Sequence, residues 1–352
     1  MKVLSLFDGM ACGMLAFKSI GIEVESYDAY EIDKYAIKTA THNFPIIKHN
    51  GDVFTADFTK HKGVDFVVGG SPCTYWSIAQ KNNRETEPSG MGWELFSQYV
   101  RAIEEAEPKY FIYENNKSMS ASIRASIDKA FGFSAVYINS ALVSAQNRQR
   151  LYWVGKRNAD GTYSKVDVKQ PKGRGILLRD VLETCTDIKC LSDREIDYMV
   201  RNSTGNYSDR WSYCQKPSES EKSLCITANI HKGVPYNVVA EPIRIGSNTG
   251  LYEIPTDKPM YEVKDGFITI KGKQYPIKLA DGYYIIRKLT VTECKRLQTV
   301  PEWYEFPVSN CQAYKMLGNG WTVEVIAHLI KAALTNRTAR EEMEQISIFD
   351  VV

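Results

Sequence analysis

One cysteine stands on a loop whose composition favours a reactive side chain. The loop reads Gly69-Gly70-Ser71-Pro72-Cys73 and ends the apolar run 64–69. Two glycines and a proline shape a tight turn, which puts Cys73 at the carboxyl end of a strand, where α/β proteins bind ligands. The alternative is a buried, unreactive thiol, as most cysteines outside disulfides are. The position at the binding edge favours a nucleophile.

A nucleophile of this kind needs a proton donor, and the following segments supply candidates. The strand candidate 109–113 ends at Glu114-Asn115-Asn116, so a carboxyl group reaches the same edge. A carboxylic acid there can protonate or hydrogen-bond a ring nitrogen. Further on, Gln146-Asn147-Arg148-Gln149-Arg150 sets two arginines just before another apolar strand. We expect one arginine to serve the site and the other to bind phosphate or structure.

Three earlier segments carry groups suited to a nucleoside-like cofactor. The turn Phe7-Asp8-Gly9-Met10-Ala11-Cys12-Gly13 lets the backbone approach a ligand and opens a helix. Glu31 ends the second strand, where a carboxylate accepts hydrogen bonds from ribose hydroxyls. Asp52-Val53 supplies an acceptor for an exocyclic amine beside an apolar contact. The glycine turn alone is as consistent with a structural role, but the three together indicate a cofactor site.

These groups must be positioned by a sheet, and the hydrophobic pattern predicts one. Strand candidates are 2–7, 24–30, 64–69, 109–113, 134–140 and 150–155. Helical patterns lie between and after them, near 12–20, 33–43, 92–106, 119–131, 291–298, 309–317 and 322–335. Such alternation predicts an α/β fold with a mostly parallel sheet and helices on both faces.

The composition and hydrophobic pattern of the chain change twice along the sequence. Residues 1–156 form the first part of the predicted catalytic and cofactor-binding domain. Residues 157–285 are rich in Gly, Pro, Ser, Asn and Lys, which predicts a small, irregular, strand-containing domain. Helical order returns over 286–336, where we expect the chain to rejoin the catalytic domain, and 337–352 form a tail.

Composition excludes several classes of protein. Hydrophobic content of 43% and charged content of 24% are ordinary for a globular chain, and no run of 18 apolar residues predicts a membrane span. The 8 cysteines include no CxxC pair, and with only 5 histidines we expect no metal site. Without a secretion signal, reduced thiols indicate the cytoplasm. A net charge of +2 neither requires nor excludes nucleic acid.

In the order of its motifs the chain resembles the cytosine-5 DNA methyltransferase family. The motifs are Phe7-Asp8-Gly9, Glu31, Asp52, Pro72-Cys73, Glu114-Asn115, Gln146-x-Arg148-x-Arg150, the segment Arg287 to Gln298, and Gly318-Asn319. Each is weak alone, but eight in order are specific. The match covers residues 1–155 and 286–335. Its motifs are most similar to those of the de novo branch and of phage-type bacterial members.

The resemblance implies a Rossmann-like methyltransferase fold that uses S-adenosylmethionine. Cys73 would attack carbon 6 of cytosine, Glu114 would engage N3 and the exocyclic amine, and Arg150, with Arg148, would hold Cys73 and the base. The residues implied to bind the cofactor are Phe7, Asp8, Gly9, Met10, Glu31, Ile32, Asp52, Val53, Pro72, Leu95, Asn319 and Trp321. Residues 157–285 would be the target-recognition domain.

Further expectations concern substrate and setting. The resemblance implies a bacterial or phage-encoded cytoplasmic protein that flips a base out of double-stranded DNA and acts as a monomer. One branch of the family methylates transfer RNA, but that branch usually lacks a long recognition segment, whereas about 130 residues separate Arg150 from Arg287 here. A catalytically silent DNA-binding relative is the third possibility, against which intact Cys73, Glu114 and Arg150 argue.

Two details of the sequence complete these expectations. The chain departs from common family residues at Thr74, Asn116 and Gly320, none of which performs chemistry, although Asn116 could alter the packing behind the flipped base. The tail segment Gln345-Ile346-Ser347-Ile348-Phe349 resembles the short peptide by which bacterial proteins dock on the replication sliding clamp. The alternative, which we favour, is that its apolar side chains pack back on the catalytic domain.

Overall fold

The computed structural model describes residues 1–78, 84–183, 189–201, 209–217, 222–243 and 259–335. The chain divides into two compact units. The first unit comprises Met1–Asn139, Gln149–Lys172 and Trp321–Val352, and the second comprises Ser140–Arg148 and Gly173–Gly320. The predicted domain boundaries at 157 and 286 therefore fall inside these units, and the predicted clamp peptide Gln345–Phe349 lies outside the described residues.

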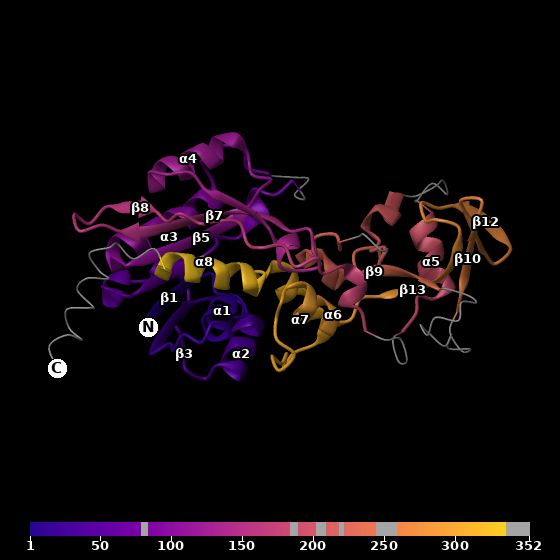
Figure 1. The fold of residues 1–352 in the computed structure, drawn as a ribbon, viewed down its shortest axis with the longest axis horizontal. Helices are drawn as coiled ribbons and strands as arrows, with labels where there is room; N and C mark the ends of the chain where they lie inside the picture. Colours follow the sequence, from indigo (N-terminus) through magenta and orange to yellow (C-terminus); the bar gives the residue numbers. More distant parts are fainter. Residues whose placement is uncertain (79–83, 184–188, 202–208, 218–221, 244–258, 336–352) are drawn as a thin grey trace. The chain divides into compact units, whose positions relative to one another are not determined.

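The first unit is built on an eight-stranded sheet (Figure 1). Its strands run in the order β3 (Ile47–His49), β2 (Ser26–Tyr30), β1 (Lys2–Leu6), β4 (Phe66–Gly69), β5 (Tyr110–Asn116), β7 (Gln149–Arg157) and β6 (Val136–Asn139), with β8 (Tyr163–Lys165) paired to β7. Pairing is parallel from β3 to β5, whereas β7 is antiparallel to both of its neighbours. The carboxyl ends of β1 to β5 therefore lie at one edge.

Helices cover both faces of this sheet, which confirms the predicted fold class. They are α1 (Cys12–Ser19), α2 (Lys34–Asn43), α3 (Met91–Ala106), α4 (Ala121–Phe131) and α8 (Val323–Thr335). Alternation along β4 sends Phe66 toward α1, where its ring meets Phe17 at 5.3 Å, and sends Val67 into the cluster formed with α3 and α4. Helix α8 packs on α1.

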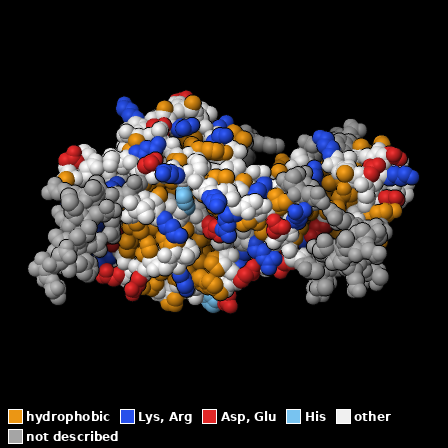
Figure 2. Space-filling model, in the orientation of Figure 1, with side chains coloured by type: hydrophobic (Ala, Val, Ile, Leu, Met, Phe, Trp, Pro, Cys, Tyr) orange, Lys and Arg blue, Asp and Glu red, His pale blue; other side chains and the backbone are white. Residues whose placement is uncertain are grey.

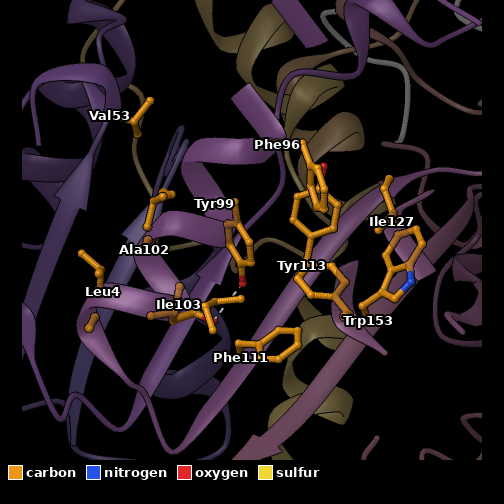
Figure 3. Packing of buried hydrophobic residues seen from close by; sticks show 14 of the residues in the cluster. Leu4, Val53, Phe96, Tyr99, Ala102, Ile103, Phe111, Tyr113, Ile127 and Trp153 are labelled. Atoms are coloured by element: carbon orange, nitrogen blue, oxygen red, sulfur yellow. Dashed lines mark hydrogen bonds between the residues drawn. The ribbon is translucent and has the colours of Figure 1, made fainter. Parts of the chain in front are cut away.

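The core between the sheet, α3 and α4 is rich in aromatic side chains (Figure 3). The rings of Tyr99 and Tyr113 are 4.8 Å apart, and Phe96 meets Tyr113 at 5.2 Å. The Tyr99 hydroxyl lies within hydrogen-bond distance of the carbonyls of Val67 (3.1 Å) and Ile112 (2.8 Å). Because these side chains are fully buried and satisfied, they fix β4 and β5 side by side.

The second unit contains a five-stranded antiparallel sheet. Its order is β12 (Lys273–Pro276), β11 (Phe267–Ile270), β10 (Tyr261–Lys264), β13 (Gly282–Lys288) and β9 (Val238–Ile243). Helix α5 (Asp193–Val200), which the sequence pattern did not predict, supplies Ile196, Met199 and Val200 to the core of this unit. Helices α6 (Val291–Leu297) and α7 (Asn310–Asn319) belong here rather than to the first unit.

A buried ion-pair cluster ties α6 to this sheet. Arg287, whose side chain is 0% exposed, lies 2.7 Å from a carboxylate oxygen of Glu241 on β9 and 2.7 Å from one of Glu293 on α6. Glu293 also accepts the amide of Thr290 and so closes a capping box. Since a buried charge left without its partner costs several kcal/mol, roughly 3–5, the three side chains act as one structural element.

On the face that Figure 2 shows, neither positively nor negatively charged side chains are in large excess. Lysine and arginine side chains are spread over this face, with aspartate and glutamate among them (Figure 2). None of the helices that the structure describes is long and apolar enough to cross a bilayer. Among the described residues no group of three or more His, Cys, Asp or Glu side chains could hold a metal ion.

Candidate active site

The loop after β1 has an unusual backbone. Phe7, Gly9 and Ala11 have φ of 57°, 58° and 60°, so every second residue is left-handed, a conformation that side chains other than glycine rarely adopt. Such strain is concentrated at ligand-binding loops. Nothing in the sequence pattern predicted left-handed Phe7 and Ala11. Helix α1 follows directly, and a Cβ at its Gly13 would lie 2.7 Å from the Tyr27 hydroxyl, so glycine allows the helix to pack closely on β2.

Glu31 holds two loops of this edge together. Its Oε2 accepts the Gly9 amide at 2.8 Å, and its Oε1 accepts the amides of Ile32 and Asp33, each at 2.8 Å. The carboxylate has about four acceptor positions, so about one is left for a ligand hydroxyl. Glu31 therefore fits a ribose contact, and it also fixes the shape of the Phe7–Ala11 loop.

Asp8 points into the protein rather than toward solvent. Its Oδ1 accepts the hydroxyls of Ser5 (2.6 Å) and Tyr27 (2.7 Å), while its Oδ2 is buried without a hydrogen-bond partner in the structure. Burial raises the pKa of Asp8 to about 6, against the lowering effect of its two hydroxyl donors, with Glu31 adding a further increase. The side chain is thus an internal support for the loop, and a cofactor contact from Asp8 would use its backbone.

The remaining cofactor candidates of the first unit differ in exposure. Asp52 is exposed and caps a short 3-10 helix by accepting the Phe54 amide at 3.0 Å. Ile32 is 74% exposed at the end of β2, which leaves an apolar side chain available to a flat ligand. Of the other candidates, Met10 and Val53 are buried, Leu95 is half-buried and Pro72 is exposed. Exposed Ile32 and Asp52 at neighbouring strand ends, with the strained loop and Glu31, fit a nucleoside of the type in S-adenosylmethionine.

The cysteine loop is pressed against β5. A Cβ on Gly70 would lie 2.8 Å from both the backbone oxygen and Oε2 of Glu114, so only glycine permits this approach. Cys73 itself is half-buried at the start of a short 3-10 helix, Cys73–Tyr75. The loop after β4, which carries Cys73, therefore passes directly beside Glu114 at the end of β5.

A buried polar cluster beneath the loop fixes its backbone. The hydroxyls of Ser71 and Tyr113 are 2.7 Å apart, and the Asn115 side-chain amide donates to the Ser71 carbonyl at 3.2 Å and to the Tyr113 hydroxyl at 3.2 Å. All three side chains are buried, and burial raises the pKa of Tyr113 so that its hydroxyl stays neutral. Sequence reasoning missed Ser71 and Tyr113 because their roles depend on contacts across two strands.

Glu114 is held from two sides. Arg150 Nε lies 2.9 Å from Glu114 Oε1, and Trp321 Nε1 donates to Glu114 Oε2 at 2.9 Å. The side chains of Arg150 and Glu114 are only 15% and 12% exposed, so this ion pair is largely shielded from solvent. The structure thus joins Glu114 and Arg150, two predicted catalytic residues, and adds Trp321, which the sequence assigned to the cofactor.

The structure explains one of the three departures from the family pattern, the one at Asn116. Asn116 is buried, donates to Asn115 Oδ1 at 3.2 Å and accepts the Ser118 hydroxyl at 2.6 Å. A polar side chain is therefore accommodated there by a polar environment. Thr74 is exposed, and the carbonyl of Gly320 accepts from Arg148 and Gln298.

Arg148 and Asn319 belong to the second unit. Arg148 is 3% exposed, and its guanidinium donates to the carbonyls of Ile226 (2.9 Å), Gly320 (2.7 Å) and Gly318 (3.3 Å). A Cβ on Gly318 would lie 2.2 Å from the backbone of Thr227, so the backbones at Gly318 and Thr227 are in direct contact. The two arginines of the Gln146–Arg150 motif therefore have different partners, one a carboxylate and the other backbone carbonyls.

One cavity among the described residues lies away from these side chains. It has a volume of about 570 Å³ and is lined by Val100, Phe111, Phe131, Arg157 and Tyr163, among others. Its lining comes from α3, α4 and β8, from Phe111 near the amino end of β5 and from Arg157 at the carboxyl end of β7, whereas Glu114 lies toward the other end of β5. None of the predicted site residues lines this cavity.

Comparison with known proteins gives one consistent result. The profile of the C-5 cytosine-specific DNA methylases matches residues 1–335. The orphan methyltransferase M.SPRI of Bacillus phage SPR is 26% identical, over 94% of this chain and 97% of its own. The type II methyltransferase M.FnuDI of Fusobacterium nucleatum is 25% identical, over 99% of this chain and 100% of its own. The solved S. pombe Dnmt2 methyltransferase, 16% identical, covers 95% of this chain and 98% of its own with a TM-score of 0.62, which shows a shared fold.

Proposed function

Because this chain belongs to the C-5 cytosine-specific DNA methylase family, we propose that it methylates cytosine within a specific sequence of double-stranded DNA through a covalent bond to Cys73. Family membership confirms the resemblance carried by the ordered motifs, and it makes the chain an S-adenosylmethionine-dependent methyltransferase. The observation that supports the covalent route most directly is the shared position of the Cys73 loop and Glu114, which Gly70 makes possible.

The chemistry requires both groups. Carbon 5 of cytosine is a poor nucleophile until the Cys73 thiolate adds to carbon 6, which pushes electrons toward N3 and carbon 5. Glu114 stabilises that charge by protonating or hydrogen-bonding N3 while an oxygen accepts from the exocyclic amine. The bound cofactor supplies an electrophilic methyl group to carbon 5. Loss of the carbon-5 proton to a base and expulsion of the Cys73 thiolate then restore the aromatic ring.

The cofactor would lie along the carboxyl ends of β1, β2 and β3. There the Phe7–Ala11 loop would offer backbone groups, Glu31 would accept from a hydroxyl, and Asp52 would accept from an exocyclic amine. Because carbon 6 is inaccessible inside a duplex, the target base must leave the stack. The second unit would supply target recognition, and the chain would act as a monomer on DNA.

Trapping with a modified base tests the covalent route. Duplex DNA carrying 5-fluorocytosine at the target should form a stable adduct in the presence of S-adenosylmethionine, because fluorine cannot leave as a proton. The adduct should survive denaturing electrophoresis with the native chain and be absent with Cys73→Ala. An adduct of the alanine variant would refute the assignment of Cys73.

Labelled methyl transfer decides the substrate class. Duplex DNA should accept methyl groups and transfer RNA should not, with Cys73→Ala as the control for both. Transfer to transfer RNA alone would replace DNA by the RNA alternative. No transfer to either, from a chain that binds S-adenosylmethionine and DNA, would identify a catalytically silent relative. Sequencing methylated positions in DNA exposed to the protein would then give the target.

A further inference from the structure

We propose that Trp321 is a positioning residue for Glu114, through the 2.9 Å hydrogen bond from its indole nitrogen to Glu114 Oε2. This inference rests on the proposed function, in which Glu114 engages the flipped cytosine. Trp321 stands 207 positions from Glu114 in the sequence, just before α8, and both residues belong to the first unit.

The indole nitrogen can only donate one hydrogen bond, and it gives that bond to the catalytic carboxylate. Arg150 fixes the other oxygen, so each oxygen of Glu114 has one protein donor. A carboxyl group has about four hydrogen-bonding positions on its two oxygens, which leaves about two: one accepts from the exocyclic amine and the other carries the proton shared with N3 of the base. The two protein donors thus set the plane of the carboxyl group without consuming its capacity to bind the base.

This constraint matters because a glutamate carboxyl group has little intrinsic orientation. Rotation about its last torsion is broad and roughly two-fold, so a single donor on Oε1 would leave the plane of the group poorly defined. The backbone beside it is fixed on one side, since Gly70 approaches the same Oε2 too closely for any side chain. Trp321 donates to that same oxygen, and we infer that it holds Glu114 ready for the base.

The substitution Trp321→Phe removes the N–H group and keeps an apolar ring. We expect kcat to fall by about tenfold, because orientation of a catalytic group is lost while the group remains. The dissociation constant of S-adenosylmethionine, measured by calorimetry, should stay within about twofold, since the phenyl ring preserves apolar contact. A large loss of cofactor affinity with unchanged kcat would overturn the proposal and leave Trp321 as a cofactor contact only.

The first unit offers a matched control. Trp153 Nε1 donates to Asp128 Oδ1 at 2.7 Å, an indole–carboxylate bond of the same kind within the core. Trp153→Phe should lower the melting temperature but leave kcat within about twofold of the native value. If both variants lose activity in proportion to their loss of stability, Trp321 has a structural role alone and the proposal fails.

A double-mutant cycle shows whether Trp321 acts through Glu114. Single-turnover rates, with enzyme in excess over DNA, are compared for Trp321→Phe, Glu114→Ala and the double variant. In the Glu114→Ala background the tryptophan substitution should change the rate by less than about twofold, because its acceptor is gone. Additive losses would overturn the proposal. Full activity of Glu114→Ala itself would instead refute the proposed mechanism, so the two failures are distinguishable.

Discussion

Arg150 and Glu114 form an ion pair across neighbouring strands, with Arg150 Nε 2.9 Å from Glu114 Oε1. Strands β5 and β7 are antiparallel, and Arg150 is paired in register with Asn116, two positions from Glu114. Residues two apart on a strand share a face, so the guanidinium and the carboxylate meet on the same side of the sheet.

The first prediction concerns this pair. Arg150→Ala should lower kcat by about 100-fold, because Glu114 is left largely buried without its cation and its orientation is lost. Arg150→Lys should recover part of the activity, since it restores charge but not the planar donor. Steady-state kinetics with a saturating DNA duplex measure both variants. Equal activity of the lysine variant and the native chain would mean that the geometry of the pair is unimportant.

The second prediction concerns the support beneath the cysteine loop. Tyr113→Phe removes the hydroxyl that meets Ser71 and Asn115 but keeps the ring, so it should cost about 1 kcal/mol of unfolding free energy. It should also lower kcat several-fold, because the Cys73 loop loses a fixed contact. The matched control is Tyr99→Phe, whose hydroxyl contacts the Val67 and Ile112 carbonyls. Denaturation and turnover assays should show similar stability losses but an activity loss only for Tyr113→Phe.

The third prediction is a pH dependence of stability that arises from Asp8. Its pKa is raised from 3.8 to about 6 in the folded chain, so folding favours the protonated form. The stabilisation is full below about pH 4 and is lost as pH rises through about 6, for a total of about 3 kcal/mol. Asp8→Asn cannot ionise, so its unfolding free energy relative to the native chain should increase between pH 4 and 7.5.

The test is how the difference in unfolding free energy between Asp8→Asn and the native chain changes with pH, measured by denaturant titration. Any constant cost of the new amide group cancels between the two pH values. A difference that stays level from pH 4 to 7.5 would show that Asp8 titrates normally in the folded chain.

The fourth prediction separates Arg148 from Arg150. Arg148→Ala removes the buried guanidinium that donates to the carbonyls of Ile226, Gly318 and Gly320, so it should cost about 3 kcal/mol of unfolding free energy. Arg148→Lys should not restore it, because an ammonium cannot match the fork of the guanidinium. Thermal unfolding and turnover at low temperature are compared. Normal stability with abolished turnover would instead support the direct catalytic role that the family resemblance implied.

Much of the first unit could be predicted because its signals are local. Apolar runs ending in Gly, Pro or acidic residues mark β1, β2, β4 and β5, and each predicted strand is present with small shifts at its ends. The position of Cys73 and Glu114 at the same edge of the sheet follows from parallel topology, and the structure shows that their strands, β4 and β5, are neighbours. Strand β5 extends through Glu114 to Asn116, further than predicted, because pairing with β7 continues where the hydrophobic pattern stops.

The sequence by itself determined the family, the positions of six strands along the chain and the residue types at the candidate edge, because periodicity, turn residues and motif order are properties of neighbouring positions. Only the tertiary structure decided which other groups hold these residues in position. The bond between Trp321 and Glu114 joins residues 207 positions apart, and Arg148 and Arg150 differ in partner although one residue separates them. Hydrogen-bond partners depend on how distant segments are packed, and no local pattern contains that information.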